Sequence, residues 1–181
     1  IPYMSDIFEK PETGLIGGAP LRDRHAVVTG ATRGIGWEIT QTLARLGANV
    51  TLMGRDEALL ASQVAELDGD HDSVACDVGG AASVDAAFGA AIDTKGPVEI
   101  LVNNAGIGDS APFHRMSDEH WNTIINTNLN GAFHCTRRVY PAMRVAGWGR
   151  IVNVASTAGL KGYGYIAAYA ASKHGVVGLT R

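Results

Sequence analysis

The sequence predicts a single α/β domain with a Rossmann-type, doubly wound parallel sheet. Three observations support this prediction. Short, continuously apolar runs alternate with helical segments, a glycine-rich turn joins the first run to a helix, and the 181 residues fit one domain. Apolar runs without polar alternation indicate strands covered on both faces, which is typical of parallel sheets with helices on each side.

The expected elements alternate regularly from residue 25 onward. Strands are expected at residues 26–28, 50–53, 73–76, 98–102 and 151–154. Helices are expected at residues 34–46, 57–67, 82–94 and from 117 to about 144, and a last helix begins near Ala167. Ser117 is suited to cap its helix, because Asp118 and Glu119 then occupy the first turn, where the helix dipole favours acidic side chains.

The two ends of the chain depart from this alternation. Residues 1–23 contain three prolines without a sustained hydrophobic period, and we expect an N-terminal extension there. Residues 24–181 are expected to form the dinucleotide-binding and catalytic domain. Because a full fold of this type has about six strands, we expect the sequence to be truncated after the fifth strand and the start of the following helix.

Composition argues against several classes of function. The net charge is -3 and the basic residues are scattered, so nucleic-acid binding is not expected. No apolar run is long enough to cross a membrane, and residues 1–20 lack the pattern of a signal peptide. Cys76 and Cys135 are interpreted as buried free thiols, which indicates a reducing, cytoplasmic location. The six histidines lack metal-ligand spacing, so no metal site is predicted.

The glycine-rich turn from Thr29 to Gly36 is predicted to bind the phosphates of a dinucleotide. Glycines permit the tight turn, the close approach of backbone to a pyrophosphate and the close packing of helix on strand. The helix N-terminus offers free N–H groups and the positive end of its dipole. The expected cofactor contacts here are Gly30, Thr32, Arg33, Gly34, Ile35 and Gly36.

The spacing of these glycines resembles the cofactor turn of the short-chain dehydrogenase/reductase family. The resemblance continues to the C-terminus through the motifs Asn103-Asn104-Ala105-Gly106, Asn128, Ser156 and Tyr169-Ala170-Ala171-Ser172-Lys173, in the family's order and with similar spacings. The last motif is most similar to those of 3-oxoacyl and polyketide ketoreductases. The resemblance implies an enzyme that transfers a hydride between a nicotinamide cofactor and a carbonyl or secondary alcohol.

Tyr169 and Lys173 are the predicted catalytic pair, because residues four apart share one face of a helix. An adjacent ammonium stabilises a phenolate and brings its pKa towards the range that acid–base catalysis needs. In the family this tyrosine exchanges the proton with the substrate, and the lysine also holds the nicotinamide ribose. An exposed tyrosine beside a solvated lysine is the alternative, and the companion motifs argue against it.

Ser156 and Asn128 complete the predicted catalytic set. Ser156 follows a buried strand, where its hydroxyl can polarise a substrate carbonyl; Thr157 is a rival donor, and a loop-capping hydroxyl is the structural alternative. Asn128 is unfavourable within a helix, and in the family this residue bends the helix while its main chain holds a water leading to the lysine. Asn126 and Asn130 are close enough to leave the assignment open.

Two further segments are predicted to contact the cofactor. Asn104, Ala105 and Gly106 leave the fourth strand, and the family uses this turn against the adenosine ribose and the central sheet. Asp77 and Val78 follow the third strand, where the family's aspartate accepts a hydrogen bond from the adenine amino group. A turn-capping aspartate is the competing interpretation.

The end of the second strand favours NADP(H) over NAD(H). NAD-preferring folds place a carboxylate there to bind the ribose hydroxyls, whereas this chain has Gly54 followed by Arg55. A guanidinium at that point is suited to a 2′-phosphate, and Arg33 can approach from the glycine turn. Asp56 complicates this prediction, since a shift of one residue would bring it towards the ribose.

Assembly into a homodimer or homotetramer is expected, with a small-molecule substrate as the other partner. The helix from Ser117 and the last helix carry more apolar residues than one sheet face covers, and family members often pair these helices across a two-fold axis. The residues concerned are Trp121, Ile125, Leu129, Phe133, Tyr140, Val176, Val177 and Leu179.

Two other functions stay open from the sequence. A sugar epimerase or dehydratase can share the fold, although those enzymes have a different glycine spacing and no Asn-Asn-Ala-Gly turn. A catalytically silent dinucleotide-binding or scaffolding protein is the rival from another class. Nucleotide binding without turnover of any ketone or alcohol would identify the silent protein.

Overall fold

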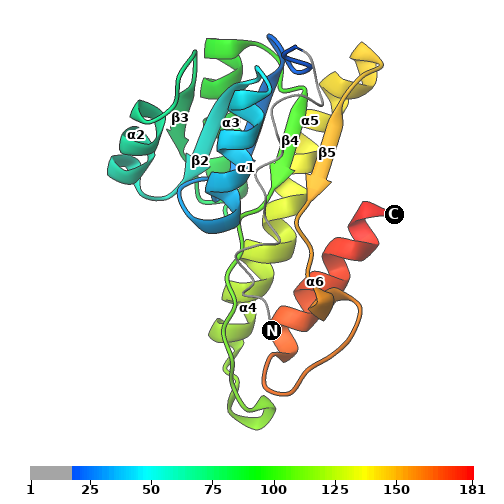
Figure 1. Ribbon diagram of the computed structural model, residues 1–181. Helices are drawn as coiled ribbons and strands as arrows, with labels where there is room; N and C mark the ends of the chain where they lie inside the picture. Colours follow the sequence, from blue (N-terminus) through cyan, green and yellow to red (C-terminus); the bar gives the residue numbers. More distant parts are fainter. Residues whose placement is uncertain (1–17) are drawn as a thin grey trace, which may run out of the picture.

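The computed structural model describes residues 18–181, and residues 1–17 of the expected N-terminal extension lie outside the described part. Strands and helices alternate along the described residues (Figure 1). The strands are β1 (His25–Thr29), β2 (Asn49–Gly54), β3 (Asp72–Ala75), β4 (Ile100–Asn103) and β5 (Arg150–Asn153). The helices are α1 (Gly34–Arg45), α2 (Glu57–Ala65), α3 (Ala81–Lys95), α4 (Asp118–Ile125), α5 (Gly131–Ala146) and α6 (Ala167–Thr180), with short turns η2 (Phe113–Arg115), η3 (Asn126–Asn130) and η4 (Thr157–Gly159).

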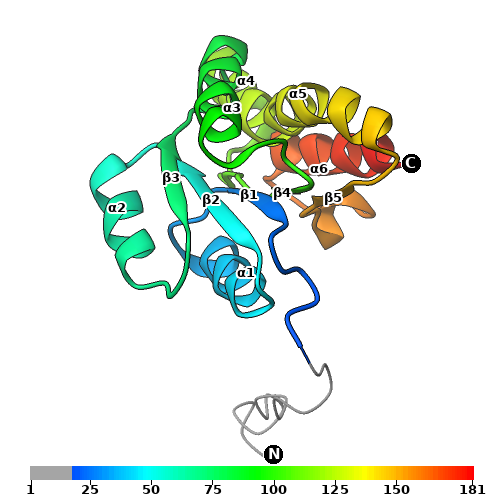
Figure 2. The same ribbon diagram turned by 90° about the horizontal axis from the view of Figure 1, so that it is seen from above.

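The sheet is parallel throughout and has the order β3-β2-β1-β4-β5. Helices α1 and α2 pack on one face, and α3 and α5 pack on the other (Figure 2). The strand order reverses between β1 and β4, which is the point where ligands bind in open α/β sheets, at the carboxyl ends of the strands. The predicted Rossmann-type fold class is therefore confirmed.

The core explains why the strands read as continuously apolar. In β1 and β4, Val27 and Leu101 face the α3–α5 side, while Val28 and Val102 face the α1–α2 side. Successive side chains of a strand point to opposite faces, and here both faces are covered. All five residues of β1 are buried as a result.

Two of the expected boundaries differ from the structure in an informative way. The long helix expected from Ser117 is divided into α4 and α5 by η3, a π-helical turn. Ser117 caps α4 as predicted, since its side chain accepts a hydrogen bond from the His120 N–H. Strand β4 begins later than expected, although the Glu99 N–H still donates to the His25 carbonyl before the strand proper.

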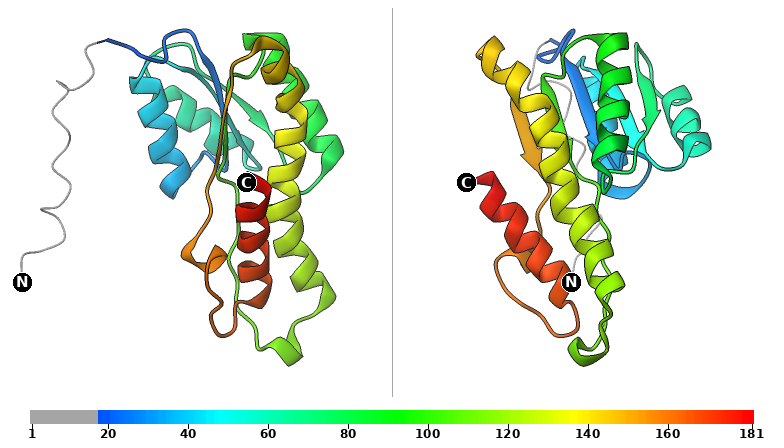
Figure 3. Two further views of the ribbon diagram at one scale, coloured as in Figure 1. Left: turned by 90° about the vertical axis from the view of Figure 1, so that its right-hand side faces the viewer. Right: turned by 180° about the vertical axis from the view of Figure 1, so that it is seen from behind.

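Helix α6 lies alongside α4 and the π-helical turn η3 (Figure 3). Gly175 allows the close approach, because a Cβ there would lie 2.7 Å from the Leu129 side chain. Val176 is buried at 2% exposure, so the expectation that it forms part of an exposed apolar face is wrong.

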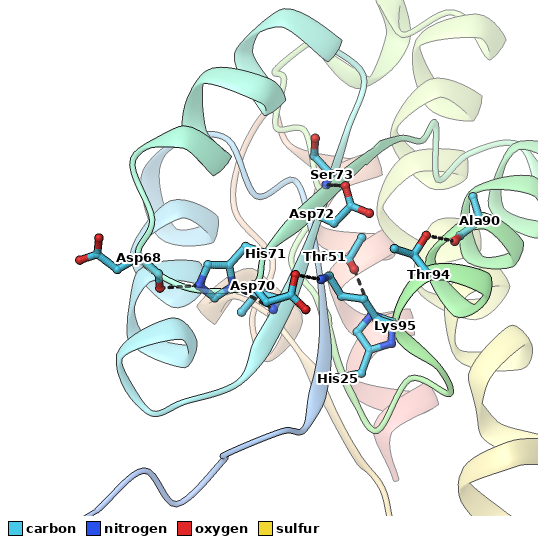
Figure 4. A network of polar contacts seen from close by, with 11 residues as sticks. His25, Thr51, Asp68, Asp70, His71, Asp72, Ser73, Ala90, Thr94 and Lys95 are labelled. Carbon is cyan, nitrogen blue, oxygen red and sulfur yellow. Dashed lines mark hydrogen bonds and ion pairs between the residues drawn. The ribbon is translucent and has the colours of Figure 1, made fainter.

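A polar network fixes the amino-terminal edge of the sheet, opposite the strand ends that carry the motifs (Figure 4). The buried His25 ring contacts the Gly96 carbonyl through Nδ1 at 2.8 Å and the Thr51 hydroxyl through Nε2 at 2.9 Å. Burial lowers the pKa of His25. Close by, Lys95 pairs with Asp70 at 2.7 Å. Because both ring nitrogens make hydrogen bonds within the protein, the role of His25 is structural.

Candidate active site

A cleft of about 940 Å³ opens at the carboxyl ends of β1, β2, β3, β4 and β5. Its volume lies within the ~300–1,000 Å³ range of small-molecule and cofactor sites. Figure 1 shows the arrowheads of β4 and β5 pointing to the end of the molecule where α4 and α6 lie. Most of the predicted site residues line this cleft: Gly30, Thr32, Arg33, Ile35, Gly36, Arg55, Asp77, Val78, Asn104, Ala105, Gly106, Tyr169 and Lys173.

The glycine turn has the backbone that its sequence predicts. Gly30 and Gly34 adopt positive φ angles of 64° and 54°, which favour glycine. A Cβ at Gly36 would overlap the Gly30 carbonyl oxygen, so close packing of α1 on the turn requires glycine there. Helix α1 begins at Gly34, and its free N–H groups lie at the edge of the cleft. Gly34 itself is not among the lining residues.

Thr29 joins the glycine turn to the segment after β4, a role that the sequence analysis did not assign. Its buried hydroxyl accepts hydrogen bonds from the N–H groups of Asn104 and Ala105, at 3.1 and 3.0 Å. The Asn104 side chain donates in return to the carbonyls of Thr29 and Gly30. Hydrogen bonds within the protein thus hold the glycine turn and the segment after β4 together. Thr29 is the last residue of β1, and that position is the sequence signal for this role.

The end of β2 places Arg55 in the cleft beside Asp56. Strand β2 ends at Gly54, as the cofactor prediction requires. Asp56 is the N-cap of α2, where its Oδ1 accepts the Leu59 N–H at 3.0 Å. One carboxylate oxygen is therefore committed to the helix, and Arg55, whose side chain is exposed, is the basic group that follows β2.

Asp77 lies in the cleft wall and also stabilises its own turn. Its Oδ1 accepts the Gly79 N–H at 3.0 Å, and its own N–H donates to the Ser83 hydroxyl. Both interpretations of this residue are therefore compatible with the structure, since the second carboxylate oxygen has no protein donor among the described residues. Val78 is buried at 7% exposure and packs closely on Gly131 of α5.

Tyr169 and Lys173 lie one turn apart on α6 and both line the cleft. The Lys173 ammonium lies 5.8 Å from the centre of the Tyr169 ring. It also donates to the Val154 carbonyl at 2.7 Å. Lys173 is buried at 5% exposure, and burial lowers its pKa. The alternative interpretation, a solvated lysine, is therefore wrong. Tyr169 and Lys173 lie next to each other in the same cleft.

Asn128 occupies the middle of the π-helical turn η3 and is 2% exposed. Its side-chain amide contacts the Ile107 backbone through two hydrogen bonds, of 2.8 and 2.9 Å. Asn126 and Asn130 instead pair with each other at the surface. The structure therefore distinguishes Asn128 from its two neighbours, although Asn128 does not itself line the cleft.

Ser156 caps the short turn η4, where its Oγ accepts the Ala158 N–H at 3.1 Å. The lining of the cleft includes its neighbours Val154 and Ala155 but not Ser156. The rival donor Thr157 is contacted by the Tyr163 hydroxyl at 3.5 Å. Ser156 therefore has the capping role, and its catalytic role stays a prediction.

Several lining residues were not singled out from sequence. They come from the segments immediately beside the motifs: Ile107, Gly108, Thr127, Val154 and Ala155. The sequence feature that could have identified them is their position, since each adjoins a strand end or a motif residue. Cys76, which the sequence indicated only as a buried thiol, also lines the cleft. Burial raises the pKa of the Cys76 thiol to about 11, so Cys76 stays protonated near neutral pH.

Two other site classes are not found in the described part of the chain. Among residues 18–181, no group of three or more His, Cys, Asp or Glu side chains is arranged to hold a metal ion. None of the described helices combines the length and apolar character that a membrane crossing requires.

The structure is a Rossmann-type domain with a cleft at its strand ends, and a tyrosine–lysine pair lines that cleft. Residues 24–181 match the family described as short chain dehydrogenase. The chain belongs to this family, and the resemblance seen in its motifs is confirmed.

Named relatives are reductases and dehydrogenases. The chain is 47% identical over 161 residues to ketoacyl reductase 1 of the granaticin polyketide synthase from Streptomyces violaceoruber, covering 86% of this chain and 59% of the relative. It is 40% identical over 164 residues to acetoacetyl-CoA reductase from Shinella zoogloeoides, covering 87% and 65%.

A solved variant of actinorhodin polyketide ketoreductase with NADPH superposes with a TM-score of 0.84 at 42% identity, covering 87% of this chain and 62% of that structure. The chain thus spans roughly three fifths of the length of the relatives that it matches.

Proposed function

We propose that the protein transfers a hydride between NADP(H) and a carbonyl or secondary alcohol, with Tyr169 as the general acid and base. The observation that carries this proposal is the position of Tyr169 and Lys173 on one face of α6, in the same cleft as the glycine turn. The names of the relatives favour a ketone within a 3-oxoacyl group as the substrate.

The cleft residues fit a nicotinamide dinucleotide from end to end. The N-terminus of α1 and the glycine turn suit the pyrophosphate. Asp77 and Val78 suit the adenine, and Gly106 lies beside Lys173, since a Cβ at Gly106 would lie 3.7 Å from Nζ. Lys173 would hold the nicotinamide ribose. When bound, the reduced nicotinamide supplies the hydride.

The side chains then handle the proton and the carbonyl dipole. In reduction, the Tyr169 hydroxyl donates its proton to the oxygen that gains negative charge; in oxidation, the phenolate accepts it. The Lys173 ammonium stabilises the phenolate. Ser156 accepts a backbone hydrogen bond in the structure, and a hydroxyl that accepts still has its own proton to donate. We propose that this proton polarises the substrate carbonyl.

The preference for NADP(H) rests on Arg55, because Asp56 is engaged as a helix cap. We expect wild-type protein to have a larger kcat/KM with NADPH than with NADH. Arg55→Ala should lower this ratio by about 10-fold or more, since hydrogen bonds to charged groups contribute ~1.5–3 kcal/mol. Steady-state kinetics with both nucleotides at one ketone concentration measure the ratio.

Arg45→Ala is the matched control, because Arg45 lies in the last turn of α1 and is absent from the cleft lining. This variant should keep the wild-type ratio. A wild-type ratio below one, or a ratio that Arg55→Ala leaves unchanged, would show that Arg55 does not bind the phosphate.

We further propose that the protein assembles as a homodimer or homotetramer through α5 and the end of α6. Large apolar side chains stay exposed there, with Phe133 at 44%, Tyr140 at 54% and Leu179 at 40%. Light scattering at micromolar concentration should therefore give a mass at least twice that of one chain. A monomeric mass would contradict this proposal.

A further inference from the structure

Ser172 lies on α6 between the two catalytic candidates and is fully buried. Its hydroxyl donates to the Tyr169 carbonyl at 2.7 Å and accepts from the Asn128 Nδ2 group at 3.1 Å. A serine hydroxyl has one proton. Because a carbonyl oxygen can only accept, that proton must face Tyr169, and only a donor can face the remaining lone pair.

This direction fixes the orientation of the Asn128 amide. With Nδ2 turned to Ser172, Oδ1 accepts the Ile107 N–H at 2.8 Å and Nδ2 donates to the Ile107 carbonyl at 2.9 Å. A flipped amide would set oxygen against oxygen and N–H against N–H at Ile107. The Ser172 hydroxyl and the Ile107 backbone thereby favour the same orientation of the Asn128 amide, so that Ser172 supports the contact between η3 and the segment that follows β4.

That segment is the wall of the cleft beside the catalytic candidates. A Cβ at Gly108 would lie 3.7 Å from the Tyr169 ring carbons Cδ2 and Cε2. A Cβ at Gly106 would lie 3.4 Å from Asn128 Oδ1. Ile107, which Asn128 holds, is therefore the central residue of a wall that contacts Tyr169 on one side and Asn128 on the other.

We propose that Ser172 is a positioning residue for the reaction. Through Asn128 it sets the distance between the cleft wall at Ile107 and the phenol of Tyr169. Ser172 does not touch the substrate in this account, and its effect on rate rests on the proposed function of Tyr169. Its effect on the Ile107 segment is independent of that function.

The chain offers a matched control on the same helix. Thr180 donates to the Val176 carbonyl at 2.7 Å and accepts from the Asn153 side-chain amide at 3.0 Å. The pattern of the two bonds is that of Ser172, but Thr180 lies at the far end of α6 and outside the cleft lining. Thr180 is exposed, whereas Ser172 is buried. Thr180→Ala therefore tests whether losing such a pair of bonds elsewhere on α6 affects the reaction, and the Tm of each variant accounts for stability.

Ser172→Ala should lower kcat by about 10- to 100-fold, because small displacements of reacting groups have effects of that size. The Kd for NADPH should change little, since the groups that bind the nucleotide remain. Thr180→Ala should keep the wild-type kcat. Ser172→Thr should retain most of the wild-type kcat even where the added methyl lowers Tm. A kcat that follows Tm across these variants would overturn the proposal.

Amide hydrogen exchange gives a readout that needs no activity. The Ile107 N–H should exchange at least ~10-fold faster in Ser172→Ala than in wild type, and at the wild-type rate in Thr180→Ala. Unchanged Ile107 exchange in Ser172→Ala would overturn the positioning role. A wild-type protein without turnover would contradict the proposed function alone.

Discussion

Tyr169→Phe is expected to lower kcat by ~10²–10⁴-fold, the usual contribution of general acid–base catalysis. The substitution removes the hydroxyl and keeps the ring that lies against Gly108. The fold and the glycine turn should be unaffected, so the Kd for NADPH should stay close to the wild-type value. The effect on the chemical step can be measured in single-turnover reduction of a ketone, with the reaction monitored by the loss of the reduced-nicotinamide absorbance.

Tyr163→Phe is the matched control for this experiment. Its hydroxyl contacts Thr157, and the Lys161 ammonium lies 5.4 Å from the centre of its ring. Tyr163 is not among the residues that line the cleft. This variant should retain wild-type kcat. A Tyr169→Phe protein with wild-type turnover would exclude Tyr169 as the proton donor.

Lys173→Ala is expected to reduce kcat and to weaken NADPH binding together. The ammonium is proposed to stabilise the phenolate of Tyr169 and also to hold the nicotinamide ribose. This joint effect distinguishes Lys173 from Tyr169, whose removal should change kcat alone. Isothermal titration with NADPH and steady-state kinetics on the same preparation measure the two quantities. Unchanged affinity would exclude the ribose contact.

The pH dependence of stability tests the burial of the Lys173 amine. Burial lowers the pKa of Lys173 below its usual 10.5. Between the lowered value and 10.5, the unfolded chain binds more protons than the folded chain. The free energy of unfolding therefore rises with pH in that window, by at most ~1.4 kcal/mol per pH unit.

Lys173→Met should remove this rise and be no less stable than wild type at the lower end of the window. The Cys76 thiol, with its pKa raised to about 11, contributes the opposite slope in both proteins. The difference between them therefore isolates Lys173. Urea unfolding at a series of pH values measures it, and identical slopes would show that Lys173 is not buried as an amine.

The parts of the structure that the sequence predicts well are those with local causes. The glycine turn is one example, because positive φ at Gly30 and Gly34 and the close packing at Gly36 require glycine within a few residues. The central strands are another, because the burial of β1, β2 and β4 on both faces favours apolar side chains. The Tyr169–Lys173 pair is local as well, since helical spacing alone brings the two together.

The features that the sequence did not predict depend on residues far apart in the chain. The π-helical turn at η3 accompanies the bonds between Asn128 and Ile107, and no pattern around Asn128 contains that partner. Ser172 is part of a recognised motif, yet its role depends on the same distant Asn128. Its position on the last helix led us to expect Val176 in an interface between subunits, but Val176 is buried within the single chain.

We propose that a hydride passes from NADPH to a carbonyl within this cleft while Tyr169 supplies the proton. The most direct measurement uses NADPH carrying deuterium at the transferable position of its nicotinamide, with a panel of ketones that includes a 3-oxoacyl thioester. Wild-type protein should produce an alcohol with deuterium on the carbinol carbon, and Tyr169→Phe should produce it at a strongly reduced rate. Firm binding of NADPH without labelled alcohol from any ketone would contradict it, and would identify a silent nucleotide-binding protein.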